Sequence, residues 1–354
     1  MNHQHSKRRK FLKNTLGLGT AALLMPQMML SNKKTSTHSQ QDIVGHGEFT
    51  YKVNKSWALQ DPSKTPVNDC HEMVLDKMGR IYMTTTGSSN NNIIVYDRSG
   101  KVLDSWGKNF NGAHGLTLTK EGTDEFLFIT DPDAGKVYKT NLKGEVLLSL
   151  ETPKEISKYS PKDLYKPTET AVAPNGDIYI ADGYGQNFII QYTSKGEYIR
   201  HFGGTGDGDD QFDCCHGVTL DTRNPANPNL LITSRAKQEF KRFTLDGEFL
   251  ETINLPGCSV CRPVLHGDNL YFAVIITKSW ETYDGMLAVL DANNKVVSFP
   301  GGSPPAYLDG ILSKPIPEGN TFLNPHDVLV DKDENLYVPQ WNSGKTFPVK
   351  LTRV

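Results

Sequence analysis

A pattern of short apolar strands, broken by glycine and Asx turns, recurs six times from about residue 70 to the end of the chain. The third cycle shows it most clearly, with E-T-A-V, D-I-Y-I-A, F-I-I-Q-Y and E-Y-I-R-H-F in succession. Within the strands apolar residues alternate with period two, which argues against a helical solenoid. A repeat of this kind buries its apolar faces by stacking on its neighbours.

Six four-stranded units predict an all-β fold, a six-bladed β-propeller spanning residues 47–354. The sixth cycle has only three strands, whereas residues 50–57 form a lone strand with no partner nearby. We expect this N-terminal strand to complete the last blade, because closing the ring removes an exposed sheet edge. The inserts at residues 151–166 and 303–323 are expected to be loops on one face.

Residues 1–40 are expected to be a twin-arginine export signal and linker. They contain R-R-K-F-L-K followed by a modest apolar stretch that glycine and proline interrupt, which is typical of an export signal rather than a membrane span. This predicts a periplasmic or secreted protein with no transmembrane segment in its mature form. The alternative is a basic amphipathic tail.

The charge of the rest of the chain excludes one class of partner. Beyond residue 40 there are 31 basic and 40 acidic side chains, a net charge of about −9. Such a body is not built for nucleic acid. We therefore expect a small-molecule or oligosaccharide substrate, and a monomer.

The cysteines leave several possibilities open. An odd number in an exported chain leaves at least one thiol unpaired, or all of them reduced. The C-x-x-C pair could form a disulfide or bind zinc, although no second C-x-x-C supports a structural zinc site. The five residues are Cys70, Cys214, Cys215, Cys258 and Cys261.

The residues that open the six cycles are expected to meet on a ring around the central channel, because the first strand of each blade lines it. In order they are His71, His114, Thr168, His216, Arg262 and His326. His114 and His216 are 102 residues apart and His326 follows 110 later, so the three come from alternate blades. Three converging imidazoles with an open position suit catalytic zinc. The alternative is that His-Gly merely makes a good opening turn, but Thr168 and Arg262 show that histidine is not required there.

Three further residues are candidates from position alone. Asp327 follows His326 and points away from the ring, where it would hold a second, harder cation with backbone carbonyls or bond to nearby amides. Tyr184, in A-D-G-Y-G, and Arg235, in S-R-A-K, occupy matching turns after the second strands of their blades. Both are either site residues or solvated turn residues.

These motifs resemble the NHL-repeat propellers and, among them, the peptidyl-α-hydroxyglycine α-amidating lyases. The similar segments are A-H-G-L, A-D-G-Y-G, C-H-G-V, S-R-A-K and N-P-H-D-V, within residues 47–354. The resemblance implies that the three histidines hold zinc, that Tyr184 works at the reacting hydroxyl and that Arg235 lines the pocket. It also implies a structural calcium bound by Asp327 with the carbonyls of Leu116 and Met73.

The resemblance fails in the first blade. Where the family has a substrate-facing arginine, this chain has T-T-T-G-S-S-N-N-N, and it carries His71 and Arg262 on the inner ring instead. It also lacks the copper monooxygenase domain that would make a hydroxyglycine substrate. A retained metal with altered contacts suggests the same chemistry on another molecule.

Our hypothesis is an exported zinc-dependent lyase that cleaves a C–O or C–N bond in an anionic substrate. Tyr184 would move a proton if a cation lowers its pKa, Arg235 and Arg262 would hold the anionic group, and His71 is a second proton-transfer candidate. An acidic, uronate-containing oligosaccharide is favoured, which predicts a dehydratase or lyase in carbohydrate degradation.

Three alternatives to this hypothesis stay open. One is an amidating lyase that releases glyoxylate. Another is a calcium-dependent lactonase-type hydrolase using Glu72 and Glu169 of the ring. The third is a non-catalytic NHL scaffold, which would not need three histidines at one phase of the repeat.

Overall fold

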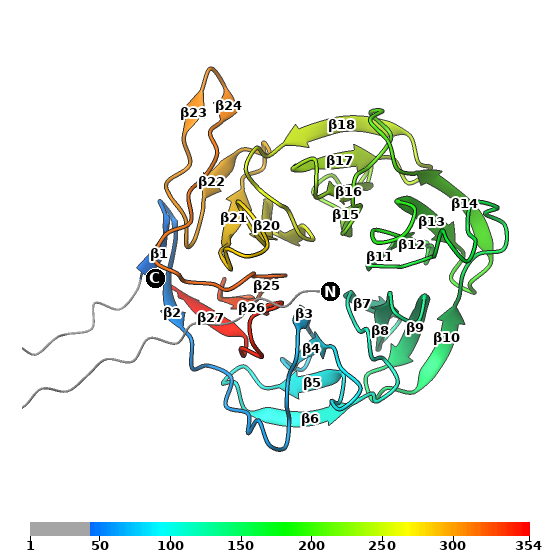
Figure 1. The fold of residues 1–354 in the computed structure, drawn as a ribbon, viewed down its shortest axis with the longest axis horizontal. Coiled ribbons are helices and arrows are strands. Elements are labelled where there is room, and N and C mark those ends of the chain that lie inside the picture. Colours follow the sequence, from blue (N-terminus) through cyan, green and yellow to red (C-terminus); the bar gives the residue numbers. More distant parts are fainter. Residues whose placement is uncertain (1–42) are drawn as a thin grey trace, which may run out of the picture. The chain divides into compact units, whose positions relative to one another are not determined.

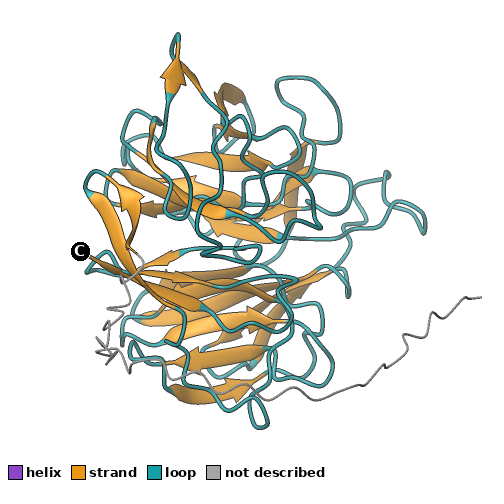
Figure 2. Ribbon diagram, turned by 60° about the vertical axis from the view of Figure 1, so that its left-hand side comes forward, coloured by secondary structure: helices purple, strands orange, loops and turns teal. Residues whose placement is uncertain are grey.

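The computed structural model describes residues 43–354, so the expected export signal at residues 1–40 lies outside the described residues. The described chain is built from strands and contains no helix (Figure 2). Across these residues no helical segment reaches the length and hydropathy of a membrane span. The predicted all-β class is confirmed.

Six antiparallel sheets surround a central axis, one for each predicted cycle (Figure 1). The first strands lie nearest the centre, and the fourth strands lie at the rim. Blades one to three comprise β3 (Cys70–Leu75), β4 (Ile81–Thr85), β5 (Ile93–Tyr96) and β6 (Val102–Trp106); β7 (Leu116–Glu121), β8 (Asp124–Asp131), β9 (Lys136–Asn141) and β10 (Val146–Leu150); and β11 (Glu169–Val172), β12 (Ile178–Ala181), β13 (Phe188–Tyr192) and β14 (Tyr198–Gly203). Blades four and five comprise β15 (Val218–Asp221), β16 (Asn229–Ser234), β17 (Glu239–Phe243) and β18 (Phe249–Asn254); and β19 (Val264–His266), β20 (Asn269–Val274), β21 (Met286–Leu290) and β22 (Val296–Ser298).

The sixth blade combines both ends of the described chain. It contains β25 (Leu329–Val330), β26 (Leu336–Val338) and β27 (Val349–Arg353), and β2 (Phe49–Asn54) pairs antiparallel with β27. In this register Tyr51 lies opposite Arg353. The predicted closing strand is therefore confirmed.

The core lies between the blades rather than inside any one of them. Six clusters of buried apolar residues each draw on two neighbouring blades. Strands β5 and β21 are consequently buried at every position, since both of their faces are covered. This explains why the middle strands read as continuous apolar runs such as I-I-V-Y.

Two elements differ from the expectation. β1 (Ile43–His46) adds a fifth strand outside β2, where no strand was predicted. The insert at residues 303–323, expected to be a loop, contains the hairpin of β23 (Tyr307–Leu308) and β24 (Ile311–Leu312). Each strand of this hairpin is only two residues long, so neither carries a periodic pattern that sequence inspection can detect.

Removal of one buried side chain from the closing strand tests its contribution. Tyr51 is fully buried and packs in the cluster between blades five and six. We expect Tyr51→Ala to lower the free energy of unfolding by about 3–5 kcal/mol, through lost burial and the cavity it leaves. The matched control is Ile43→Ala in β1, where the side chain is 62% exposed and the change should stay within about 0.5 kcal/mol. Urea denaturation measures both, and equal effects would contradict ring closure by β2.

Candidate metal centre and active site

Six residues at the openings of the inner strands form a ring at the propeller axis. His71 lies in β3, and the other five lie just before the inner strands of their blades. All six are at most 8% exposed. They are His71, His114, Thr168, His216, Arg262 and His326.

The glycines that follow two of these histidines are explained by a close approach between blades. A Cβ atom on Gly115 would lie 2.4 Å from the carbonyl oxygen of Thr168, and one on Gly217 would lie 2.8 Å from Cα of Arg262. Neither glycine has a positive φ, so turn geometry is not what requires it. Close packing between blades therefore explains the glycine of each His-Gly pair, but it does not explain the histidine.

Four imidazoles converge inside this ring. The ring centroids of neighbouring pairs are 4.5–4.9 Å apart. His114, His216 and His326 are brought together as expected. The set whose ligand atoms all lie within 4.8 Å of one another is His71, His114 and His326. His71, expected to transfer protons, thus lies among the possible metal ligands.

Backbone carbonyls orient two of the imidazoles. Nδ1 of His114 donates to the carbonyl of Thr168 at 2.8 Å, and Nδ1 of His326 donates to the carbonyl of His71 at 3.0 Å. A proton held on Nδ1 leaves the lone pair on Nε2, which is the arrangement found in histidines that bind metals. These two histidines therefore present unprotonated Nε2 atoms.

The electrostatics of the ring keep these imidazoles neutral. Burial lowers the pKa of His114 to about 3, with a smaller contribution from the nearby Arg235. Burial likewise holds the pKa values of His71, His216 and His326 well below their ordinary range. Neutral imidazoles are borderline-soft nitrogen donors and suit zinc and related transition metals. The residues present therefore fit a bound zinc ion.

The hydroxyl of Tyr184 reaches two of the four histidines. It lies 3.1 Å from Nε2 of His114 and 3.0 Å from Nε2 of His216, and these two nitrogens are 3.1 Å apart. Tyr184 is 43% exposed, so its ring reaches solvent while its hydroxyl touches the histidines. Burial of the hydroxyl raises the pKa of Tyr184, and Arg235 only partly opposes this. This direction applies to the protein without a metal ion, so the lowering of the pKa of Tyr184 by a bound cation stays a prediction.

Asp182 shapes the turn that carries Tyr184. Its carboxylate accepts hydrogen bonds from the backbone N–H groups of Lys166 and Gln186, both at 2.6 Å, and from the hydroxyl of Tyr159 at 2.7 Å. A Cβ atom on Gly185 would lie 2.0 Å from this carboxylate, which accounts for the second glycine of A-D-G-Y-G. The motif thus encodes a rigid turn around a buried acid.

A cavity of about 610 Å³ is lined by His71 and His114, and its size is typical of small-molecule sites. Arg235 lines it, and its Nε donates to the carbonyl of Val260 at 3.1 Å while Nη2 lies 3.2 Å from Sγ of Cys261. Trp280 and Trp341 pack edge to face on the same cavity, with ring centroids 5.6 Å apart. The cavity therefore combines one arginine, a tyrosine hydroxyl and an aromatic wall.

The lining residues reveal a second ring that sequence reasoning found only in part. Besides residues at the openings of the blades, the cavity is lined by residues of the turns that follow the second strands β4, β8, β12, β16, β20 and β26. The sequence analysis selected Tyr184 and Arg235 from these turns, but Thr86, Ile276 and Trp341 occupy the equivalent turns of their own blades. Comparing the same turn in all six cycles would have found them.

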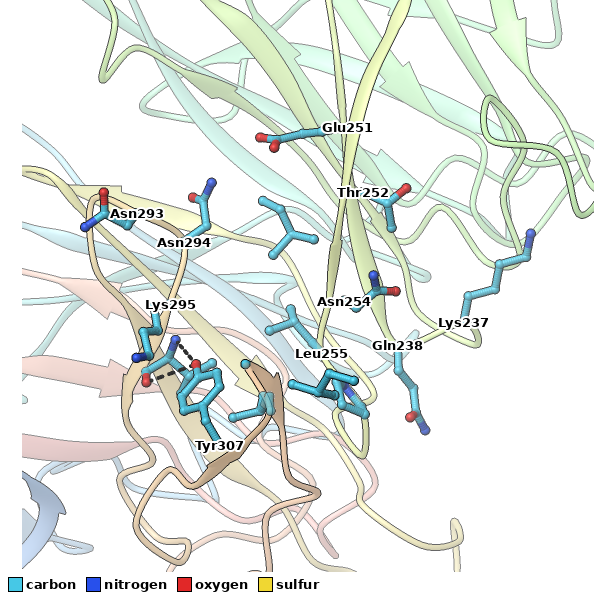
Figure 3. A pocket seen from close by; sticks show the side chains of 16 residues that line it. Lys237, Gln238, Glu251, Thr252, Asn254, Leu255, Asn293, Asn294, Lys295 and Tyr307 are labelled. Atoms are coloured by element: carbon cyan, nitrogen blue, oxygen red, sulfur yellow. Dashed lines mark hydrogen bonds between the residues drawn. The ribbon is translucent and has the colours of Figure 1, made fainter.

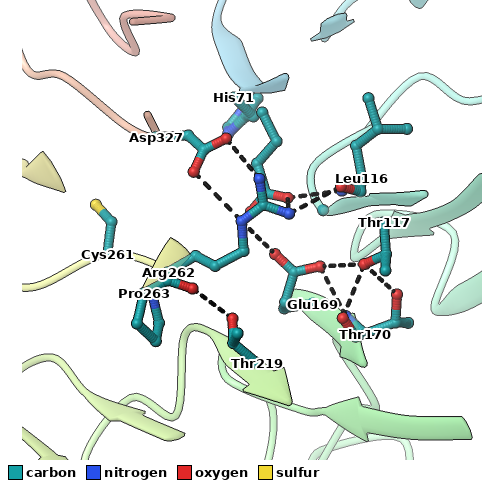
Figure 4. Close-up of polar contacts among 12 residues, drawn as sticks. His71, Leu116, Thr117, Glu169, Thr170, Thr219, Cys261, Arg262, Pro263 and Asp327 are labelled. Atoms are coloured by element: carbon teal, nitrogen blue, oxygen red, sulfur yellow. Dashed lines mark hydrogen bonds and ion pairs between the residues drawn. The ribbon is translucent and has the colours of Figure 1, made fainter. Parts of the chain in front are cut away.

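Arg262 does not line this cavity. Its Nη2 lies 2.7 Å from Oδ2 of Asp327, its Nη1 lies 3.1 Å from Oε2 of Glu72, and its Nε lies 3.6 Å from Oε2 of Glu169 (Figure 4). It lines a separate cavity of about 450 Å³ among the inner strands. This corrects the expectation that Arg262 holds a substrate anion, because three buried carboxylates already surround it.

The same guanidinium contacts the atoms that were expected to bind calcium. Nη1 donates to the carbonyl of Leu116 at 2.9 Å and Nη2 to the carbonyl of Met73 at 3.4 Å, in addition to Asp327. A cation site already filled by a permanent positive charge has no room for a divalent ion. The residues present therefore do not fit the calcium that the resemblance implied.

A further cavity lies apart from this site, and no cysteine of the described residues forms a disulfide. A larger cavity of about 810 Å³ lies between β18, β22 and the β23–β24 hairpin, and no histidine lines it (Figure 3). All five cysteines are unpaired, including Cys258 and Cys261 of the C-x-x-C motif, so the disulfide considered above does not form here.

Loss of one central imidazole tests the metal centre. His114 belongs to both possible ligand sets, so we expect His114→Ala to reduce the zinc content from about one equivalent per chain to near zero. His201→Ala, on the outer strand β14, is the matched control and should keep its zinc. Elemental analysis after dialysis measures both, and full zinc in His114→Ala would contradict the site.

The stability of the metal-free protein should depend on pH through the same residue. Unfolded histidine has its ordinary pKa near 6.5, whereas burial lowers the pKa of His114 to about 3. Between these values the unfolded state binds more protons, so stability is complete above about pH 6.5 and falls as the pH drops toward 3. Urea denaturation near pH 7.5 and 5.5 should show a smaller loss for His114→Gln than for the wild type. Equal losses would contradict the buried neutral imidazole.

Comparison with known proteins agrees with this architecture. The family described as DUF5128, a 6-bladed beta-propeller, matches residues 148–300. The human NHL repeat-containing protein 3 is 26% identical over 216 residues, which cover 58% of this chain and 60% of that protein. The peptidyl-alpha-hydroxyglycine alpha-amidating lyase 1 of Drosophila melanogaster is 29% identical over 323 residues, which cover 85% of this chain and 54% of that protein.

One solved structure shares the fold at low sequence identity. A streptogramin B lyase superposes with a TM-score of 0.56 at 16% identity, covering 85% of this chain and 97% of that chain. The match to the relatives in sequence spans little more than half of their own length. The chain is therefore a six-bladed β-propeller related to the NHL-repeat proteins and to the peptidyl-α-hydroxyglycine α-amidating lyases.

Proposed function

We propose that this chain is a zinc-dependent lyase that breaks a C–N or C–O bond beside a carboxylate. The observation that supports this best is the Tyr184 hydroxyl, 3.0 Å and 3.1 Å from Nε2 of His216 and His114 in a cavity lined by Arg235. A scaffold has no need of a proton donor held against inward-facing imidazoles.

The metal ligands would be His114 and His326 with either His71 or His216. When bound there, zinc supplies Lewis-acid chemistry, in which a substrate oxygen is polarised and its developing negative charge is stabilised. The chain's own contribution is a set of neutral nitrogens whose orientation is fixed by the carbonyls of Thr168 and His71.

Tyr184 would act as the proton donor. Its hydroxyl lies beside the histidine nitrogens, where it can donate a proton to the departing nitrogen or oxygen, and burial raises its pKa in the metal-free protein. Arg235 would bind the substrate carboxylate, since a guanidinium pairs with a carboxylate through two parallel hydrogen bonds. Its bond to the carbonyl of Val260 fixes the direction of the side chain.

The geometry favours a carbinolamide over a larger acidic molecule. With Arg262 enclosed by carboxylates, Arg235 is the arginine that lines the cavity, together with Lys166. One carboxylate beside a hydroxyl-bearing carbon matches an N-acyl-α-hydroxyglycine, which would yield an amide and glyoxylate with no net change in protons. The sequence relatives that cover most of the chain include amidating lyases.

A uronate-containing oligosaccharide is the second candidate, in a protein acting in the periplasm or outside the cell. The observation in its favour is the aromatic wall, because the ring of Trp280 is 45% exposed at the cavity and offers a flat apolar surface. A calcium-dependent hydrolase loses its support, because Glu72 and Glu169 face Arg262 rather than an open site.

Two substrates distinguish the candidates. α-Hydroxyhippurate should release benzamide and glyoxylate with the zinc-loaded protein, whereas an acidic oligosaccharide should show no new absorbance near 230 nm and no loss of water by mass spectrometry. The reverse result would assign the oligosaccharide chemistry. No turnover of either substrate would contradict the proposed lyase.

Removal of one hydroxyl tests the proton donor. We expect Tyr184→Phe to lower kcat by about 10²–10⁴-fold, the usual contribution of general acid catalysis, while zinc content stays unchanged. Tyr198→Phe is the matched control, because its hydroxyl lies on the outer strand β14 and contacts His201. Wild-type kcat in Tyr184→Phe would remove Tyr184 from the mechanism.

A further inference from the structure

We propose that the Arg262 guanidinium is the internal structural cation of this propeller: it takes the place of a divalent metal ion at the axis and positions the histidine ring. The second part of this proposal, the positioning of the histidine ring, rests on the candidate metal centre. The first part, the structural cation, concerns only how the inner strands are held together.

The surroundings of Arg262 have the composition of a hard-cation site. The polar partners of its guanidinium are oxygen atoms, from the carboxylates of Glu72, Glu169 and Asp327 and from two backbone carbonyls. Calcium prefers this mixture of carboxylate and carbonyl oxygens. All three carboxyl groups are at most 1% exposed, so a positive charge among them offsets part of the cost of burying them.

The contacts of one side chain join most of the ring. Arg262 belongs to blade five, Glu72 and Met73 lie in β3 of blade one, and Leu116 begins β7 of blade two. Glu169 begins β11 of blade three, and Asp327 precedes β25 of blade six. Blade four is attached next to Arg262, because the hydroxyl of Thr219 donates to the carbonyl of Pro263. Figure 4 shows Asp327, Leu116 and Glu169 around the guanidinium of Arg262.

The three carboxylates offer more hydrogen-bond acceptor positions than the guanidinium of Arg262 occupies. Oε1 of Glu72 and Oε2 of Glu169 are buried without a hydrogen-bond partner. A planar fork with five N–H groups cannot face every oxygen of a three-dimensional cage. Without Arg262, the same oxygens together with water would complete the six to eight ligands of a calcium ion.

Each carboxylate contact also fixes backbone next to the histidines. Glu72 follows His71 in sequence, and its Oε2 accepts the backbone N–H of Leu116 at 2.7 Å. Asp327 follows His326, and its Oδ2 accepts the backbone N–H of Met73 at 3.1 Å. Arg262 holds both acids and so acts on the metal ligands through their neighbours. It is a positioning residue and not a catalytic one.

The experiment removes the guanidinium and supplies a metal ion in its place. Arg262→Ala and the milder Arg262→Gln are compared with the wild type in calcium-free buffer and in CaCl₂. We expect the wild type to bind no calcium and to keep the same Tm in both. The variants should lose about 5–15 °C in Tm, because an uncompensated charge cluster is left behind, and should regain most of it with calcium. Calorimetric titration of CaCl₂ into the variants should show one site.

The positioning role has a separate measurement. Cobalt bound to the histidines gives a visible absorption spectrum that reports ligand geometry. We expect the spectrum to weaken or shift in Arg262→Gln and to return with CaCl₂. Arg223→Gln is the matched control, because Arg223 pairs with the buried carboxylate of Asp221 at 2.7 Å and follows the end of β15 that is opposite to His216. This variant should lose stability without binding calcium and without changing the cobalt spectrum.

Each outcome decides one half of the proposal. Calcium binding by the wild type, or no calcium binding by both Arg262 variants, overturns the structural-cation role. A cobalt spectrum that stays unchanged while Tm falls overturns the positioning role alone. Neither result depends on turnover, so failure of the proposed lyase activity would be seen separately.

Discussion

The six inner strands meet around one axis and bury polar groups from every blade. These groups must form hydrogen bonds and ion pairs with one another, because they are shielded from water and the apolar core lies between the blades rather than at the axis. The chain meets this requirement with two kinds of polar cluster. Neutral imidazoles face one cavity, where carbonyls of neighbouring blades accept their Nδ1 protons. A guanidinium among three carboxylates faces the other. The first cluster suits the binding of a metal, and the second makes a metal unnecessary.

Much of this arrangement could be predicted from the sequence, because equivalent positions of each repeat occupy equivalent places in the six blades. Once the cycles are aligned, the opening residue of each blade is known to face the axis, and His114, His216 and His326 follow from that alone. The closing strand was predictable for the same reason, since a sixth blade with three strands requires a fourth. The β1 strand and the β23–β24 hairpin lie outside the four-strand repeat, so the repeat could not predict them.

The charge partners of the axis could not be predicted in the same way. Glu72, Glu169 and Asp327 are separated by long stretches of sequence, and no local pattern shows that they share one arginine. The resemblance assigned Asp327, Leu116 and Met73 to calcium, and only the positions of their oxygen atoms show that Arg262 reaches all of them. The pKa of Tyr184 likewise depends on how deeply its hydroxyl is buried, which the turn sequence A-D-G-Y-G does not reveal.

Strand β2 lies near one end of the described chain, and its partner β27 lies near the other. Until these two strands pair, β2 has an open edge and the sixth sheet is incomplete. Pairing across such a distance is slow compared with hairpin formation within a blade. Closure of the ring is therefore expected late in folding, and until then the edge of β2 can pair with other chains.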